Sequence, residues 1–342
     1  MVLTKKATTI QDVARHANVS AATVSRALSN PERVSEATRA RVAEAVQTTG
    51  YTINQAARSL RMRAAKTILI ALPNIGNPFY STILEAIVLE ASARGYGALV
   101  ASPFRGDVNQ WVAEYFTSNR VDGLLLFDGS LDTRALHGLL VNGGKLPLVT
   151  SYDELPDPLV NSVTTDNVHA AERAVNYLLS LGHRRIGHVI GQSRNKLPNE
   201  RLVGFRSAMT EAGIPVRTEW VIQGDYSMRS GYLASKQFLE LAEKPTAIFA
   251  GNDEMAIGLI SGLREGGIEC PRDVSIIGFD DIVVASNFIP PLTTMRQPRD
   301  QIGRRATEVL IDILERDRYD RGPVRIVLNS ELVIRQSTRR IV

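Results

Sequence analysis

The chain has 342 residues, of which 44% are hydrophobic, so it can bury more than one core and we expect at least two folding units. Its single cysteine, Cys270, excludes an internal disulfide framework and a cysteine-based metal cluster, as suits a reducing compartment. No run of about 18 uncharged apolar residues occurs, and the first twenty residues lack the apolar core of an export signal, so we expect a cytoplasmic protein without a membrane span.

Charge is unevenly distributed along the chain. Of 40 Lys/Arg and 36 Asp/Glu, residues 1–63 contain ten and four, so this segment carries +6 and the remainder carries −2. Positive charge concentrated in a small segment is typical of nucleic-acid-binding modules, because each phosphate contact gains from counterion release. A solvated basic face would give the same count, so charge alone does not decide between the two.

Three short helices are predicted in residues 1–52. Thr9, Ser20 and Ser35 are good N-cap residues, and each precedes apolar residues at a spacing of three and four. The third helix is expected to end before Gly50, a typical C-terminal residue. Three short helices around one small core predict an all-α helix-turn-helix domain.

The second of these helices is expected to approach DNA. The small side chains of Ala21 and Ala22 at its start permit close approach to base edges, and Arg26 can reach a guanine or a phosphate. The residues expected to contact DNA from this domain are Thr9, Ser20, Ala21, Ala22, Thr23, Ser25, Arg26 and Asn30.

Four motifs stand at a characteristic spacing in this segment: Thr9-Ile-Gln-Asp-Val-Ala14, Val19-Ser-Ala-Ala-Thr-Val-Ser-Arg26, Val34-Ser-Glu-Ala-Thr38 and Gly50-Tyr51. Together they resemble the DNA-binding head of the lactose/galactose-repressor family. The plainer alternative is a generic three-helix bundle.

Residues 53–65 are basic and too weakly apolar to hold a helix alone, so we interpret them as a linker. The resemblance implies that this segment becomes a hinge helix on operator DNA. Leu60 would then insert between base pairs in the minor groove, while Arg58 and Arg61 face phosphates. Alternatively, Leu60 covers part of the body of the protein.

From residue 66 to 342, short β-rich apolar runs alternate with helical segments in two successive series. This pattern predicts an α/β effector-binding domain with parallel sheets in two lobes. We expect lobe 1 at about 66–160 and 292–322, and lobe 2 at about 161–291 and 323–342. Ligands of such sheets bind beyond the carboxyl ends of the strands.

Polar residues follow several of these predicted strands, and further motifs include Arg201-Leu-Val-Gly-Phe205 and Pro291-Leu-Thr-Thr294. They resemble the effector domain of the same family, which shares its fold with periplasmic sugar-binding proteins, so the resemblance covers nearly the whole chain. It implies a small sugar-like effector bound by Asn77, Phe79, Asp153, Arg201, Tyr226, Asn252, Asp280 and Gln297.

This set of side chains suits a neutral pentose or hexose. Carboxylate, amide and guanidinium groups pair with hydroxyls, and aromatic rings suit the apolar face of a sugar. Arg299 or Arg194 turned inward would instead favour a sugar acid or monophosphate. Each residue also has a plainer interpretation: Asp253 and Asp280 as helix caps, Arg201 as an ordinary ion-pair partner, and Phe79 and Tyr226 as core residues.

We therefore predict a homodimeric, sequence-specific transcription regulator, a repressor, that binds double-stranded operator DNA under the control of the effector. The sequence contains no G-x-x-x-x-G-K-[ST], G-x-S-x-G, H-E-x-x-H or C-x-x-C motif, so we expect no catalytic residues, no metal and no cofactor. The alternatives are a sugar-binding transport protein, against which the basic head and the missing export signal count, and a sugar-acting enzyme.

Overall fold

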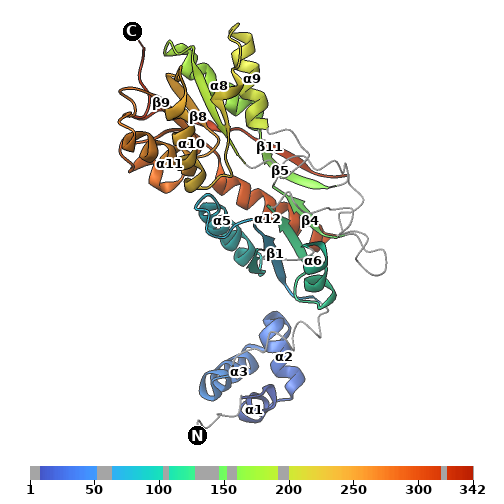
Figure 1. The fold of residues 1–342 in the computed structure, drawn as a ribbon. Coiled ribbons are helices and arrows are strands. Elements are labelled where there is room, and N and C mark those ends of the chain that lie inside the picture. The colour runs from blue at the N-terminus through green and yellow to red at the C-terminus, as the bar shows by residue number, and fades with distance from the viewer. Residues whose placement is uncertain are drawn as a thin grey trace. The chain divides into compact units, whose positions relative to one another are not determined.

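The computed structural model describes residues 8–51, 64–102, 108–127, 146–151, 160–191, 200–316 and 322–341. The chain divides into two compact units, Met1–Ala65 and Lys66–Val342, which we call the head and the body (Figure 1). Most of the predicted hinge at 53–65 lies outside the described residues. The same holds for five residues named above: Arg58, Leu60, Arg61, Asp153 and Arg194.

The head consists of α1 (Ile10–His16), α2 (Ala21–Ser29), the 3-10 turn η1 (Pro31–Arg33) and α3 (Glu36–Thr49). The Asp12 carboxylate accepts a hydrogen bond from the Thr9 amide at 2.9 Å, which secures the start of α1. Gly50, with φ 62°, ends α3 in the left-handed conformation. The core is small, and the predicted helix-turn-helix fold is confirmed. Its buried apolar residues are Val13, Ala14, Ala17, Val24, Val42 and Ala45.

The body contains two six-stranded sheets among its described residues. The sheet of lobe 1 has the order β11-β5-β4-β3-β1-β2, and all its pairs are parallel. The sheet of lobe 2 has the order β12-β10-β9-β8-β6-β7 and is parallel except for β10 with β12. The predicted two-lobed α/β fold with parallel sheets is confirmed. The lobe 1 strands are β1 (Thr67–Ala71), β2 (Gly97–Ala101), β3 (Gly123–Leu126), β4 (Leu148–Thr150), β5 (Asn161–Thr165) and β11 (Arg325–Leu328). The lobe 2 strands are β6 (Ile186–Ile190), β7 (Val221–Gln223), β8 (Ala247–Ala250), β9 (Ser275–Asp280), β10 (Thr293–Arg296) and β12 (Glu331–Val333).

Helices cover both faces of each sheet, as they must when the strands are apolar on both sides. Ile68 and Ile70 of β1 belong to one core cluster, and Leu69 and Ala71 belong to another. In lobe 1, α12 lies beside α5 although the two are far apart in the sequence (Figure 1). The helices of lobe 1 are α5 (Phe79–Ala93), α6 (Val108–Thr117) and α12 (Arg299–Arg316). Those of lobe 2 are α8 (Asn167–Ser180), α9 (Glu200–Glu211), α10 (Met228–Glu240) and α11 (Asp253–Glu265), with 3-10 turns η2 (Thr218–Trp220) and η3 (Val283–Ser286).

The strand pairings correct the predicted lobe boundaries. β5 and β11, expected in lobe 2, pair with each other in lobe 1, whereas β10, expected in lobe 1, pairs with β9 in lobe 2. The chain therefore crosses between lobes after Thr165, Arg296 and Leu328. The prediction failed because apolar runs mark where strands occur but carry no signal for which sheet each strand joins.

Candidate DNA-binding surface and effector site

The second helix of the head presents an exposed face. Ala22 and Arg26 of α2 are exposed, as is Asn30, the C-cap four residues further on, while Val24 faces the core. Ala21 and Ser25 are half-buried beside them. This face offers one cation with small neighbours, which suits insertion into a DNA groove.

Two of the predicted DNA contacts, Ser20 and Thr23, have a structural role at the start of α2. Ser20 is the N-cap, and its hydroxyl accepts a hydrogen bond from the Thr23 amide at 3.1 Å. The two hydroxyls also lie 2.9 Å apart. Thr9 is likewise the N-cap of α1. These capping bonds fix the angle at which α2 starts.

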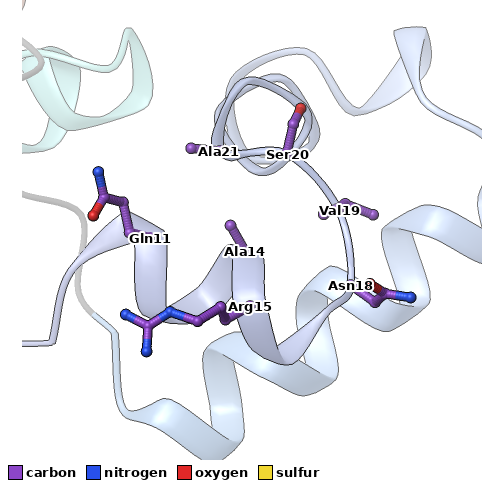
Figure 2. Close-up of a pocket in the computed structure, with 7 residues that line it drawn as sticks. All are labelled: Gln11, Ala14, Arg15, Asn18, Val19, Ser20 and Ala21. Atoms are coloured by element: carbon purple, nitrogen blue, oxygen red, sulfur yellow. The ribbon is translucent and has the colours of Figure 1, made fainter.

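An open hollow lies between α1 and α2 (Figure 2). Ser20 and Ala21 line it from α2, and the sequence alone had indicated both. Gln11 and Arg15 line it from α1 and were not predicted; Arg15 forms an exposed ion pair with Asp12 at 2.8 Å. Their signal in the sequence is weak, since both fall on the polar side of an ordinary amphipathic helix.

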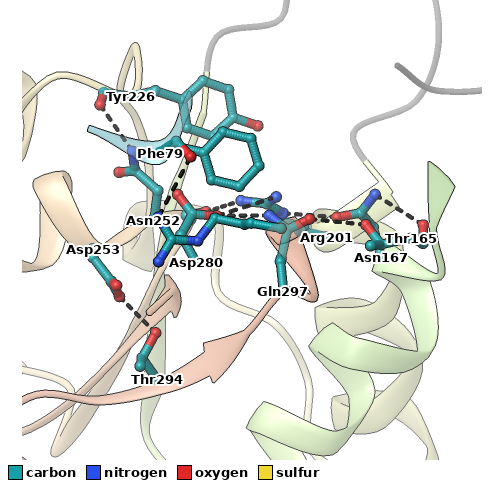
Figure 3. Close-up of polar contacts among 12 residues, drawn as sticks. Phe79, Thr165, Asn167, Arg201, Tyr226, Asn252, Asp253, Asp280, Thr294 and Gln297 are labelled. Carbon is teal, nitrogen blue, oxygen red and sulfur yellow. Dashed lines mark hydrogen bonds and ion pairs between the residues drawn. The ribbon is translucent and has the colours of Figure 1, made fainter. Parts of the chain in front are cut away.

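In the body, polar side chains gather at the carboxyl ends of the lobe 2 strands (Figure 3). Asp280 is the last residue of β9, Asn252 follows β8 and Gln297 follows β10. Thr165, at the end of β5, joins them from lobe 1 through a 2.9 Å hydrogen bond from its hydroxyl to the Gln297 side-chain carbonyl. The polar cluster therefore lies where the two lobes meet, as expected for parallel sheets of this kind.

Asp280 is the centre of this cluster. The residue is 5% exposed, and its carboxylate accepts a hydrogen bond from Gln297 Nε2 at 2.7 Å. Arg201 Nη2 lies 3.7 Å from the same carboxylate oxygen. Burial raises the pKa of Asp280 to about 6, although the charge of Arg201, the Gln297 hydrogen bond and the charge of Arg299 oppose the rise.

Arg201 stands in the first turn of α9 and is held on several sides. Its Nε donates to the Asn167 side-chain oxygen at 3.1 Å, and its Nη1 donates to the Gly251 carbonyl. The guanidinium lies 3.7 Å from the centre of the Phe279 ring. The structure thus brings Arg201 and Asp280 together and fixes the orientation of the guanidinium.

Asn252 proves to be a helix cap. Its side-chain oxygen accepts from the Met255 amide at 2.9 Å, and its side-chain nitrogen donates to the Tyr226 carbonyl at 2.9 Å. The alternative interpretation of Asp253 and Asp280 as caps is wrong, because Asn252 occupies the N-cap of α11 and Ile282 occupies the N-cap of η3. Asp253 is fully buried and accepts from the Thr294 hydroxyl at 2.6 Å; burial and the nearby Asp280 raise its pKa well above the ordinary value.

The two predicted aromatic contacts come from different lobes. Phe79 begins α5, and its amide donates to the Asn77 side-chain oxygen at 2.8 Å, so Asn77 shapes the turn before the helix. Tyr226 has φ 70° and lies so close to Gly191 that a Cβ there would be 1.8 Å from its ring. Both rings pack partly on the lobe 2 core, and in Figure 3 they lie above the Asp280 carboxylate.

Arg299 connects the two lobes through backbone carbonyls. From the start of α12, its Nη2 donates to the Asp281 carbonyl at 2.7 Å and its Nη1 lies 3.4 Å from the Phe79 carbonyl. The role of Thr165 and this role of Arg299 were not predicted, because both depend on the approach of two lobes that no local pattern describes. Asp166, at the next position after Thr165, caps α8 by accepting from the His169 amide at 2.9 Å.

The described residues contain neither a candidate metal site nor a candidate membrane span. Within these ranges, no group of three or more His, Cys, Asp and Glu is arranged to hold a metal ion. Among the described helices, none combines the length and the apolar character that crossing a membrane requires.

Comparison with known proteins identifies both units. Residues 9–54 match the bacterial regulatory proteins of the lacI family, and residues 175–338 match the periplasmic binding protein-like domain. The HTH-type transcriptional repressor CytR of Escherichia coli K12 is 36% identical, over 98% of this chain and 97% of that protein. The HTH-type transcriptional repressor PurR of Photobacterium profundum is 35% identical, over 97% of this chain and 98% of that protein.

Solved structures agree with these relatives. The lac repressor dimer bound to operator and the anti-inducer ONPF is 28% identical, with a TM-score of 0.85, and covers 98% of this chain and 100% of that one. The transcriptional regulator CelR in complex with cellobiose is 31% identical, with a TM-score of 0.73. The match covers 96% of this chain and 99% of that one. With a 36% identical relative along nearly its whole length, a helix-turn-helix head and a two-lobed body, the chain belongs to the LacI family of DNA-binding transcription regulators.

Proposed function

We propose that this protein is a homodimeric repressor whose affinity for operator DNA is controlled by a small sugar-like effector bound between the lobes of the body. The observation that carries the proposal is the cluster of Asp280, Arg201 and Gln297 at the meeting point of the lobes. The relatives CytR and PurR are repressors, and similar regulators have been solved with cellobiose and with ribose.

The chemistry of the cluster favours a neutral sugar. A carboxylate, a side-chain amide and a guanidinium can pair with adjacent hydroxyls, and Phe79 and Tyr226 offer apolar surface for the sugar ring. The Arg299 guanidinium donates to a carbonyl and lies near a second one. This arrangement supports a neutral pentose or hexose over a sugar acid or a monophosphate. Asn77, Phe79, Asp153, Tyr226 and Asn252 complete the proposed set of effector residues around the cluster.

For DNA, we propose that α2 enters the major groove with Ala22, Arg26 and Asn30 toward the bases. The basic hinge at 53–65 would follow the minor groove, with Leu60 as the wedge between base pairs and Arg58 and Arg61 on phosphates. In this scheme the helix-turn-helix domain is 1–52 and the effector-binding body is 66–342. A homodimer places two heads on a pseudo-palindromic operator.

We further propose that the protein is not an enzyme and that it works in the cytoplasm. Its relatives are transcriptional regulators, and the site offers hydrogen-bonding groups rather than a nucleophile with an adjacent base.

A thermal-shift screen tests the effector proposal, with pentoses, hexoses, cellobiose, sugar acids and sugar phosphates each added to the purified protein. A neutral sugar should raise the melting temperature of the body, because a ligand that binds only the folded state stabilises it. The Asp280→Asn variant, which keeps the shape of the side chain, should lose most of this shift. Stabilisation by sugar phosphates alone, or an equal shift in the variant, would contradict the proposed site.

The DNA-binding proposal is tested with operator sites that the protein selects from a library of random DNA duplexes. The selected sites should be pseudo-palindromic, and the sugar found in the screen should change their affinity for the protein. Sites without two-fold symmetry would contradict the dimeric mode of binding.

A further inference from the structure

The turn that carries Asp280 has an unusual backbone. Asp280 has φ 115° and Asp281 has φ 56°, so two consecutive residues with side chains adopt conformations that favour glycine. Such a turn persists only where surrounding contacts hold it. The position of the Asp280 carboxylate therefore depends on whatever fixes the next residues.

Two arginines hold the side chain of Asp281. Arg335 Nη2 lies 2.6 Å from Asp281 Oδ1, and Arg296 Nε lies 2.7 Å from Asp281 Oδ2. The Asp281 and Arg335 side chains are 9% and 15% exposed, whereas that of Arg296 is 49% exposed. Because solvent screens exposed pairs, the bond to Arg335 is the stronger restraint on the turn.

Arg335 is itself fixed to the sheet of lobe 2. It follows β12, its Nη1 donates to the Leu292 carbonyl at 2.7 Å, and its backbone amide donates to the Thr293 hydroxyl at 2.9 Å. Its guanidinium thus joins the strand beside β9 to Asp281. It is a rigid brace rather than a mobile surface pair.

The backbone after Asp280 is held at two further points. The Ile282 amide donates to Asp253 Oδ2 at 2.9 Å, and the Asp281 carbonyl accepts from Arg299. These bonds fix the backbone on the far side of Asp281, and Arg335 fixes its side chain. Asp253, Arg299 and Arg335 have no hydrogen bond to the Asp280 carboxylate among the described contacts.

We propose that Arg335 is a positioning residue for the effector site: by holding Asp281, it fixes the turn that directs the Asp280 carboxylate toward the effector. The proposal rests on the proposed function, in which Asp280 bonds the sugar. It assigns a role in effector affinity to a residue near the C-terminus that does not contact the effector.

A double-mutant cycle separates positioning from general stability. D-ribose affinity is measured by calorimetry for the parent, Arg335→Met, Asp280→Asn and the double variant. Arg335→Met should weaken ribose binding roughly tenfold in the parent but less than about twofold when Asp280 is already replaced, because the brace acts through that carboxylate. An equal loss in both backgrounds would overturn the proposal.

Two further variants, a conservative replacement of Arg335 and a control at another arginine, complete this experiment. Arg335→Lys retains the charge but not the paired donors, so its loss of affinity should be intermediate. Arg272→Lys is the matched control, since Arg272 forms exposed ion pairs with Glu269 and Asp273 in the same lobe, and its ribose affinity should equal that of the parent.

Hydrogen exchange tests the brace without any ligand. In Arg335→Met, amides of residues 280–284 should exchange about tenfold faster than in the parent, while α8 in the same lobe is unchanged. Unchanged exchange at 280–284 would overturn the proposal, whatever sugar binds. Failure of the parent to bind any sugar would count against the proposed function alone, because the exchange result would still report whether Arg335 holds the turn.

Discussion

The head and the body of this protein reach function by different routes. In the head, the candidate DNA-binding residues Ala22, Arg26 and Asn30 come from one helix and its C-cap, are exposed and stand four positions apart. In the body, the effector cluster draws on segments from Phe79 to Arg335, and most of its side chains are buried and bonded to one another. A single substitution should therefore remove one contact in the head but disturb several in the body.

The contrast also concerns electrostatics. Arg26 of the head faces solvent, where its charge is available to phosphates and bases. In the body, charges of opposite sign lie close together. Burial raises the pKa of Asp280, and the positive charges of Arg201 and Arg299 lower it. This difference fits the proposed partners, which are strongly charged DNA for the head and a small neutral sugar for the body.

The largest expected effect concerns packing in the body. A Cβ on Gly258 of α11 would lie 1.9 Å from the Met228 carbonyl, and this backbone atom cannot move cheaply. Gly258→Ala should lower the free energy of unfolding of the body by about 3 kcal/mol. Calorimetry should show the head transition unchanged, with the exposed Ser261→Ala in the same helix as control. A parent-like melting temperature would mean that α10 and α11 are less tightly packed than described.

The next effect concerns DNA recognition by the head. Arg26→Ala should weaken operator binding by about 2 kcal/mol, since a base-reading arginine contributes roughly this amount. The sugar-induced thermal shift of the body should be unaffected, because all the proposed effector residues belong to the body. Fluorescence anisotropy with selected and random duplexes measures the effect, and an equal loss on both would assign Arg26 to phosphates instead.

The third effect is a pH dependence confined to the body. The pKa of Asp280 is raised from 3.8 to about 6, so the folded state binds this proton more tightly than the unfolded state does. The free energy of unfolding should thus rise as pH falls from about 6 to about 4, while sugar affinity should fall roughly tenfold from pH 7 to pH 5 as the carboxylate is protonated. Asp280→Asn should abolish the trend in affinity and weaken the trend in stability, to which the buried Asp253 also contributes. Sugar affinity of the parent that does not change with pH would show that the carboxylate is not used.

The smallest effect concerns a cap in the head. Asp12→Ala removes the carboxylate that accepts from the Thr9 amide, so the head should lose about 1 kcal/mol of stability. Chemical unfolding followed by helical circular dichroism measures this, and the body transition serves as the internal control. If the unfolding transition of the head has the same midpoint as in the parent, Thr9 and Asp12 do not determine where α1 starts.

This comparison also separates what the sequence could predict from what it could not. The caps at Thr9 and Ser20 and the C-terminal Gly50 are local signals, so the helices of the head followed from residues close in sequence. Asp280, Arg201 and Gln297 came from a family resemblance, and the structure brings them together. The sheet membership of β5, β10 and β11 did not follow, because pairing is set by contacts distant in sequence.

The supporting residues were the least predictable. Arg335 and Thr165 carry no local motif, and each matters only through a partner far along the chain. Asn252, proposed to bind the effector, also has both groups of its side-chain amide in bonds within the protein, which its position after a strand did not predict. Position after a strand indicates that a residue is near the site, but only the bonds in the fold distinguish support from recognition.

We propose that effector binding in the body controls operator binding by the head. The most direct test measures the operator dissociation constant with and without the sugar identified by thermal shift, and the sugar dissociation constant with and without operator. Linkage requires both to change by the same factor, and we predict a factor of at least about five. Operator affinity that is identical without sugar and at saturating sugar would contradict the account.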